Sequence, residues 1–232
     1  MRYKAVSAML FSLAAFGFVT HFASASTTGI LVPTYEGYYK EWKPSTGSTH
    51  YTLVDETPCN STDYNATTTI AKRDSYGISL STVGNGAYIS QIDIQPCASR
   101  QTTGTGTATS NVFYRYNGVD SSDAGNYALS GTTPVQLATT TFSSLNLFKT
   151  ATSTLETGMI YSAGDKGARL SRIATKVTYT LSAPSAPSNL TASSVGSTQM
   201  NLGWTDNSTN ETEFQIYRAL NDGAYSKIAT TT

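Results

Sequence analysis

The chain has 232 residues, with 15 lysines and arginines against 15 aspartates and glutamates, so its net charge is zero. Charged residues make up 13% of the chain, against about 25% in an average soluble protein. This balance excludes the basic footprint that a protein binding nucleic acid or an anionic membrane surface would carry.

The first 25 residues have the pattern of a secretory signal peptide. Arg2 and Lys4 form a positive amino-terminal region, residues 8–20 form an apolar run, and residues 23–25 (Ala-Ser-Ala) form a cleavage site. The run is shorter than the roughly 20 residues of a membrane-spanning helix, so an uncleaved anchor is the less favoured alternative. Residues 1–25 hold two basic and no acidic residues, which leaves the mature chain a net charge of −2. We expect a secreted protein without a membrane span in its mature part.

A segment rich in aromatic residues follows. Residues 38–42 (Tyr-Tyr-Lys-Glu-Trp) predict a strand, and residues 50–54 (His-Tyr-Thr-Leu-Val) predict a second extended piece after a Pro-Ser-Thr-Gly break. An exposed aromatic ring can stack on the apolar face of a sugar while its polar edge stays wet. The alternative is that at least half of these rings pack in the core. The candidate ligand-binding residues are Trp42, which is the best single candidate, Tyr38, Tyr39 and Tyr51.

The next stretch contains both cysteines, Cys59 and Cys97. In an oxidising compartment an even pair predicts a disulfide, worth about 4 kcal/mol for a loop of this length. In the clearest strand, Ile92 and Ile94 alternate with polar residues. Strict alternation puts Cys97 on the outer, polar face, and a bulge at Pro96 that switches faces is the alternative.

Short alternating segments continue to residue 181. Three of them place apolar residues on one face each: Tyr76, Ile78 and Leu80; Val112, Tyr114 and Tyr116; and Ile173, Val177 and Tyr179. Many short strands separated by Gly, Asn and Pro turns, without an amphipathic helical pattern, indicate an all-β protein. We predict an antiparallel β-sandwich over residues 27–181, closed by the disulfide.

One loop contains a set of oxygen ligands, Asn117, Asp120 and Asp123, among glycines. Oxygen ligands on a flexible loop suit calcium, although the spacing matches no EF-hand and the same residues are common loop formers. These three residues are candidate calcium ligands, and the sequence suggests no other cofactor.

Residues 182–187 carry two prolines among serines and alanines, which predicts a short, stiff linker. The segments that follow are 187–192 (Pro-Ser-Asn-Leu-Thr-Ala), 200–206 (Met-Asn-Leu-Gly-Trp-Thr-Asp) and 213–218 (Glu-Phe-Gln-Ile-Tyr-Arg). Together they resemble a fibronectin type III domain over residues 186–232.

The resemblance implies a partial fibronectin type III β-sandwich over residues 188–232, after the linker. It implies that Trp204 is the core tryptophan of that family and that Phe214 and Ile216 pack against it. The stretch is about half of a domain of about 100 residues, and the later strands of the family are missing. We therefore expect the chain to be the amino-terminal part of a longer protein.

The larger domain also resembles known sandwiches over residues 50–180. The segments that carry this resemblance are 54–57 (Val-Asp-Glu-Thr), 62–64 (Thr-Asp-Tyr), 72–76 (Lys-Arg-Asp-Ser-Tyr) and 167–174 (Gly-Ala-Arg-Leu-Ser-Arg-Ile-Ala). They are similar to the jelly-roll-like sandwiches of bacterial surface proteins and phage-tail-like proteins. The resemblance implies a binding or structural role and brings no catalytic residues.

The residues themselves form no catalytic constellation. His50 is the only histidine outside the signal peptide, and no nucleophile-elbow motif accompanies it, so we expect it at the surface or at the end of a strand. Asp55 and Glu56 are adjacent, so in a strand they would point to opposite faces and could not flank one glycosidic bond.

We therefore predict a non-enzymatic extracellular protein for binding, adhesion or structural display, whose partner is a glycan or a protein at a cell surface. Attachment to that surface would come from sequence beyond Thr232. The alternative is a carbohydrate-binding accessory module of a secreted polysaccharide-degrading enzyme. An exposed aromatic row favours the alternative, a buried row favours the first hypothesis, and a pocket joining His50 to a carboxylate would favour an enzyme.

Overall fold

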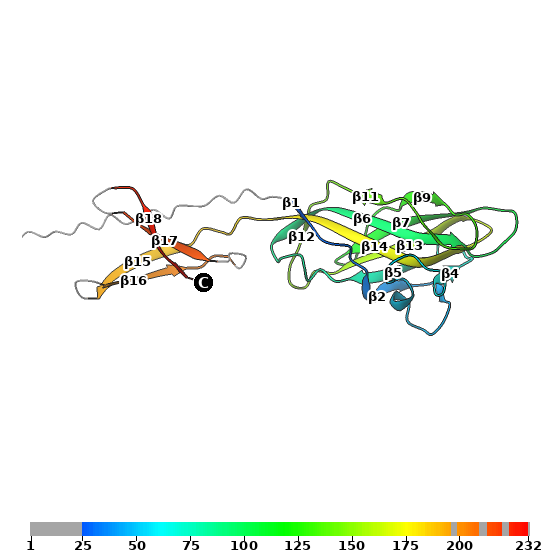
Figure 1. Cartoon of the computed structure of the whole chain (residues 1–232), viewed down its shortest axis with the longest axis horizontal. Helices are drawn as coiled ribbons and strands as arrows, with labels where there is room; N and C mark the ends of the chain where they lie inside the picture. Colours follow the sequence, from blue (N-terminus) through cyan, green and yellow to red (C-terminus); the bar gives the residue numbers. More distant parts are fainter. Residues whose placement is uncertain (1–24, 196–198, 209–212, 220–222, 232) are drawn as a thin grey trace, which may run out of the picture. The chain divides into compact units, whose positions relative to one another are not determined.

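A computed structural model shows the fold (Figure 1) and describes residues 25–195, 199–208, 213–219 and 223–231. The predicted signal peptide lies outside these residues except for Ala25. All sheets are antiparallel, so the predicted all-β class is confirmed. In these ranges the single helical element is the 3₁₀ helix η1 (Tyr51–Leu53), and no helix there has the length and apolar character needed to cross a membrane.

The described chain divides into two compact units, one ending at Ser182 and one beginning at Ala183. The first unit is a sandwich of two sheets. Its eight-stranded sheet has the order β10 (Val135–Gln136), β6 (Ala87–Arg100), β14 (Ala168–Leu181), β4 (Asn65–Thr67) and β3 (Lys43–Pro44). In addition, β1 (Ala25–Thr27) pairs with β14, and β11 (Thr140–Phe142) and β12 (Leu147–Phe148) pair with β6.

The six-stranded sheet packs against the other face of the core. Its order is β2 (Pro33–Lys40), β5 (Arg73–Ile78), β13 (Leu155–Gly164), β7 (Ala108–Tyr116) and β8 (Val119–Asp120), with β9 (Ala124–Ala128) also paired to β7. The alternation predicted for residues 76–80 and 112–116 is confirmed, because the predicted inward residues of both segments belong to the core cluster.

The two longest strands, β6 and β14, keep one face on the core by means of bulges. Thr178 pairs with Gln91 but Tyr179 pairs with Ile89, which leaves Ser90 as an extra residue of β6. A single extra residue moves the following side chains to the opposite face. The core residues of β6 therefore lie at odd positions before the bulge and at even positions after it: Ala87, Ile89, Ile92, Ile94 and Ala98.

A second bulge lies beside the disulfide. Leu170 pairs with Ala98 and Arg172 pairs with Cys97, so Ser171 is the extra residue of β14, with its Oγ 3.3 Å from Cys97 Sγ. Cys97 is fully buried but is not part of the core cluster, and its disulfide to Cys59 is present. The predicted disulfide is confirmed, and the bulge lies on the neighbouring strand rather than at Pro96.

Of two local predictions in the aromatic segment, one is wrong and one is confirmed only in part. Residues 51–53 of the predicted extended piece 50–54 form η1, because the Leu53 N–H donates to His50 O and the Val54 N–H donates to Tyr51 O. The strand predicted at residues 38–42 ends at Lys40 as the last residue of β2.

The second unit consists of two two-stranded sheets. One pairs β15 (Ser188–Val195) with β16 (Gln199–Thr205), and the other pairs β17 (Phe214–Arg218) with β18 (Ser226–Thr231). The rings of Trp204 and Phe214 lie 5.3 Å apart, and Ile216 is half-buried on the strand of Phe214. None of the described residues from Ala183 onward is fully buried.

The variant Cys59→Ala/Cys97→Ala should lose about 4 kcal/mol of unfolding free energy, because the bond joins residues 38 apart in the sequence. Guanidinium denaturation of the oxidised wild type and of the variant measures this difference. Wild type reduced with dithiothreitol is the matched control and should unfold near the midpoint of the variant. A difference below about 1 kcal/mol would contradict a stabilising role.

Candidate functional site

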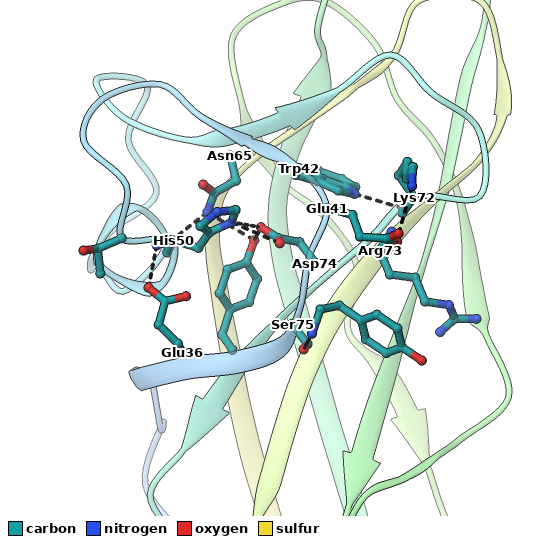
Figure 2. Close-up of polar contacts among 12 residues, drawn as sticks. Glu36, Glu41, Trp42, His50, Asn65, Lys72, Arg73, Asp74 and Ser75 are labelled. Carbon is teal, nitrogen blue, oxygen red and sulfur yellow. Dashed lines mark hydrogen bonds and ion pairs between the residues drawn. The ribbon is translucent and has the colours of Figure 1, made fainter.

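Buried polar side chains from both sheets meet beside η1 (Figure 2). The Nδ1 atom of His50 lies 3.0 and 2.8 Å from the two carboxylate oxygens of Asp74, which is fully buried on β5. The Tyr76 hydroxyl donates to Asp74 Oδ2 at 2.8 Å. Asn65, on β4 of the opposite sheet, donates from Nδ2 to the Tyr76 hydroxyl at 3.2 Å and to His50 O at 2.8 Å. This His50–Asp74 cluster therefore ties the two sheets together.

The electrostatics of the cluster follow from this geometry. The hydrogen bond to Asp74 raises the pKa of His50, although burial of the ring works against it. Burial raises the pKa of the Asp74 carboxyl, and the contacts with His50 and Tyr76 offset part of that rise. Burial, followed by the charge of Asp74, raises the pKa of Tyr76 well above its usual value.

A histidine held by a carboxylate is also the arrangement that orients a catalytic base. Catalysis additionally requires a nucleophile or a substrate within reach of the imidazole. His50 is only 6% exposed, and among the described side chains no serine, threonine or cysteine hydrogen-bonds to its ring. The expectation of a surface or strand-end histidine is thus wrong, and the geometry supports a structural role for the pair.

The aromatic row predicted for ligand binding divides into buried and exposed parts. Trp42 is 2% exposed, and its indole Nε1 donates to Lys72 O at 2.9 Å, so its ring cannot stack on a sugar (Figure 2). Tyr51 is partly buried and packs against the core cluster. Tyr39 is half-buried, whereas Tyr38 is 67% exposed. The prediction of Trp42 as the leading binding residue is therefore wrong.

Tyr38 and Tyr39 belong to what we call the Tyr–Arg surface, on the outer side of the six-stranded sheet. The guanidinium of Arg115 lies 4.3 Å from the centre of the Tyr38 ring, and that of Arg73 lies 4.5 Å from the centre of the Phe113 ring. The Tyr39 and Phe113 rings meet edge to face at 5.8 Å. Phe113 and Arg115 lie on the outer side of β7 because they alternate with its core residues. Phe113 is itself fully buried, in contact with Tyr39 and Arg73. The members of the surface are Tyr38, Tyr39, Arg73, Phe113 and Arg115.

Two carboxylates fix this surface. Arg115 Nη1 donates to Asp120 Oδ1 and the Tyr39 hydroxyl donates to Asp120 Oδ2, both at 2.6 Å. Arg73 Nη2 donates to both oxygens of Asp123 at 2.8 Å. Partial burial acts to raise the pKa of Asp120, but the hydrogen bonds from Tyr39 and Arg115 outweigh it and hold the pKa below its usual value.

The calcium site predicted at Asn117, Asp120 and Asp123 is therefore wrong. Both carboxylates are held by arginines, and Asn117 Oδ1 accepts the Thr154 N–H at 2.9 Å. Within the described ranges no group of three or more histidine, cysteine, aspartate or glutamate side chains is placed to hold a metal ion. Asp120 and Asp123 act instead as counter-ions of the two arginines of the Tyr–Arg surface.

A glycine explains why Phe113 can lie flat against the sheet. Gly158 of β13 is paired with Phe113 of β7, and a Cβ on Gly158 would collide with the Phe113 ring and with Asp74 O. A glycine inside a strand often marks such a close approach. Gly158 is therefore the feature of the sequence that could have pointed to the Tyr–Arg surface.

Comparison of the chain with protein families, with curated proteins and with solved structures finds no match. The class of protein that the structure itself defines is an all-β, disulfide-bonded antiparallel β-sandwich followed by a smaller β unit. The jelly-roll-like and fibronectin type III resemblances stay predictions.

A third set of polar side chains lies in the loop between η1 and β4. Burial, together with the neighbouring carboxyl of Asp63, raises the pKa of Glu56 to about 7. Glu56 Oε2 is buried and has no hydrogen-bond partner among the described residues. The folded chain therefore holds a carboxyl group that titrates near neutral pH.

The His50→Gln variant tests the structural role of the His50–Asp74 cluster. Because the pKa of His50 is raised in the folded state, its contribution to stability is complete below the unfolded value of 6.5 and is lost as the pH rises through the folded value. Urea denaturation measures the free energy of unfolding. At about pH 6 this free energy should be about 3 kcal/mol lower in His50→Gln than in the wild type, and the difference should become smaller above that pH.

The variants Asp74→Asn and His50→Gln/Asp74→Asn complete a double-mutant cycle. Because the two side chains are in contact, the double variant should lose less stability than the sum of the single variants. Additive losses, or a His50→Gln deficit that does not change with pH, would contradict the ion pair.

Glu56→Gln should change the pH dependence of stability over a different pH range from His50→Gln. With a pKa of 4.5 unfolded and about 7 folded, Glu56 favours folding at low pH, and this contribution is lost as the pH rises to about 7. The variant should match the wild type near pH 4.5 and exceed it above about pH 7, measured as midpoints of thermal unfolding. Asp63→Asn is a comparison variant that keeps Glu56 but removes the neighbouring carboxyl, so the pH range in which the Glu56 contribution is lost should move to lower pH. If the plots of unfolding midpoint against pH are parallel for the wild type and Glu56→Gln, the raised pKa of Glu56 is refuted.

Proposed function

We propose that residues 25–182 form a non-enzymatic extracellular binding module that acts in adhesion or display at a cell surface and contacts a partner protein through the Tyr–Arg surface. The observation that carries the proposal is the exposed ring of Tyr38, with 67% of its surface accessible and the guanidinium of Arg115 4.3 Å from its centre. The predicted signal peptide and the disulfide favour an extracellular location.

The composition of this surface favours a protein partner. Tyrosine and arginine are enriched in protein–protein interfaces and supply much of their binding energy. Both guanidinium groups are held by carboxylates, and the Asp side chains that hold them are about a quarter exposed, at 26% for Asp120 and 28% for Asp123. Side chains that are already fixed lose little conformational entropy on binding.

The accessory carbohydrate module of the sequence analysis loses its main argument, because Trp42 is buried. The stretch from Ser188 onward would, under the resemblance to fibronectin type III domains, serve as a spacer that holds the binding module away from its anchor. That role is part of the proposal.

Tyr38→Ala tests the proposal. Binding of purified chain to a panel of immobilised extracellular matrix and cell-surface proteins is measured by surface plasmon resonance, beside an array of glycans. The proposal expects a protein ligand whose affinity falls at least about tenfold in the variant, since removal of a central aromatic residue costs about 2 kcal/mol or more.

Tyr225→Ala removes another exposed tyrosine, 47% accessible and outside the first unit, and serves as the matched control. Arg115→Lys keeps the charge but loses the planar group over the Tyr38 ring, and it should also weaken binding. Equal affinity of wild type and Tyr38→Ala, or retention on glycans alone, would rule out the proposed contact.

A further inference from the structure

The first unit also contains a polar pocket that shares no residue with the Tyr–Arg surface. Its volume is about 390 Å³, within the range of about 300–1,000 Å³ for small-molecule sites. It lies at the β3–β4 edge of the eight-stranded sheet. Its lining has one aromatic ring, four aliphatic hydroxyl side chains and one amide among its ten residues: Glu41, Lys43, Pro44, Ser45, Tyr64, Ala66, Thr67, Thr68, Thr69 and Gln101.

The aromatic ring of the pocket is held in place by an arginine. The guanidinium of Arg169 lies 3.9 Å from the centre of the Tyr64 ring. Arg169 in turn donates from Nε to Gln101 Oε1 and from Nη1 to Thr132 O, both at 3.1 Å. The backbone of Tyr64 is fixed as well, since its N–H donates to Ser45 Oγ at 2.9 Å and its carbonyl accepts the Ser45 N–H at 2.8 Å.

The same contacts leave polar groups free for a ligand. Because Gln101 Oε1 accepts from Arg169, the amide Nε2 of Gln101 is a donor without a partner among the described residues. The hydroxyls of Thr68 and Thr69 likewise have no partner within those ranges, and both residues are exposed. The pocket therefore offers a rigid ring, an oriented amide donor and two hydroxyls that can donate or accept.

The charges of the lining nearly cancel. Glu41 accepts from Lys72 Nζ at 2.9 Å and from the Arg73 N–H at 2.8 Å, and Lys43 supplies one ammonium group (Figure 2 shows Glu41, Lys72 and Arg73). The hydrogen bond from Arg73 N–H, outweighing partial burial, holds the pKa of Glu41 below its usual value, so the carboxylate stays ionised. A lining with balanced charges and many hydroxyls favours an uncharged ligand that is itself rich in hydroxyls.

We propose that this pocket is a binding site for a neutral saccharide, which packs one apolar face on the ring of Tyr64 and hydrogen-bonds to Gln101, Thr68 and Thr69. An aromatic ring beside amide and hydroxyl groups matches a pyranose, whose two faces are weakly apolar and whose edge carries hydroxyls. The site is separate from the protein contact proposed for the Tyr–Arg surface, so either can fail without the other.

The test is titration of the purified mature chain with glucose, galactose, mannose, N-acetylglucosamine and their disaccharides. Saturation-transfer NMR detects contact, and calorimetry measures affinity at sugar concentrations up to about 10 mM, where weak sites are still visible. We expect at least one neutral sugar to bind. Tyr64→Ala should weaken that binding at least about tenfold, and Gln101→Ala at least about threefold.

Three further variants separate binding from folding. Tyr64→Phe keeps the ring and should bind within about twofold of wild type, because the hydroxyl is not needed for stacking. Lys176→Ala on β14 and Tyr225→Ala alter exposed residues outside the pocket and should bind as wild type. If the NMR spectrum of Tyr64→Ala shows that this variant is misfolded, the sugar affinities of Tyr64→Phe, Gln101→Ala and Thr68→Val/Thr69→Val still test the site.

Two results would overturn the proposal. One is the absence of binding by every neutral sugar, or binding that Tyr64→Ala and Gln101→Ala leave unchanged. The other is binding of galacturonate alone with loss in Lys43→Ala, which would make the pocket an anion site that depends on the ammonium group. Neither result would touch the Tyr38 experiment, because Tyr38 does not line the pocket.

Discussion

The burial of Asp74 is the constraint on which the rest of the first unit depends. A carboxylate with no exposed surface is costly unless it is paired and hydrogen-bonded, and its partners here come from His50 and Tyr76. His50 belongs to the long segment between β2 and β4, so that segment has to fold over the edge of the sandwich. Strand β2, before this segment, supplies Tyr38, and the residue just before β4 is Tyr64; these are the central rings of the two proposed sites.

Ion pairs play two different roles in this unit. The pair of His50 and Asp74 is almost fully buried and joins the start of η1 to β5, so removal of one partner would leave the other charge unpaired in the interior. The pairs of Arg115 with Asp120 and of Arg73 with Asp123 are partly exposed, and pairs of that kind add little to stability. Their effect is on orientation, since they hold the guanidinium groups against aromatic rings.

Much of the fold could be predicted from the sequence, because a two-residue period in strands such as β5 and β7 directly reports which face is buried. The all-β class and the inward residues of those strands follow from the local pattern of apolar residues, and the disulfide follows from the oxidising compartment that the signal-peptide pattern predicts. The positions of Trp42, His50 and Asp120 could not be predicted in this way. Each depends on a partner far along the chain, namely Lys72, Asp74 and Tyr39, and no local pattern reports such pairings. The pocket around Tyr64 was missed for the same reason, since it depends on Arg169.

The bulges at Ser90 and Ser171 have a consequence for how this chain can vary in length. In an ordinary surface loop an added or lost residue changes closure entropy only slightly. At Ser90 or Ser171 the loss of one residue would turn every side chain on one side of it from the core to solvent, or the reverse. The two central strands are therefore fixed in length to the single residue, while surface loops such as the one between η1 and β4 remain open to insertion and deletion. Divergence among descendants of this fold should accordingly appear as length changes in the surface loops and as substitutions alone within β6 and β14.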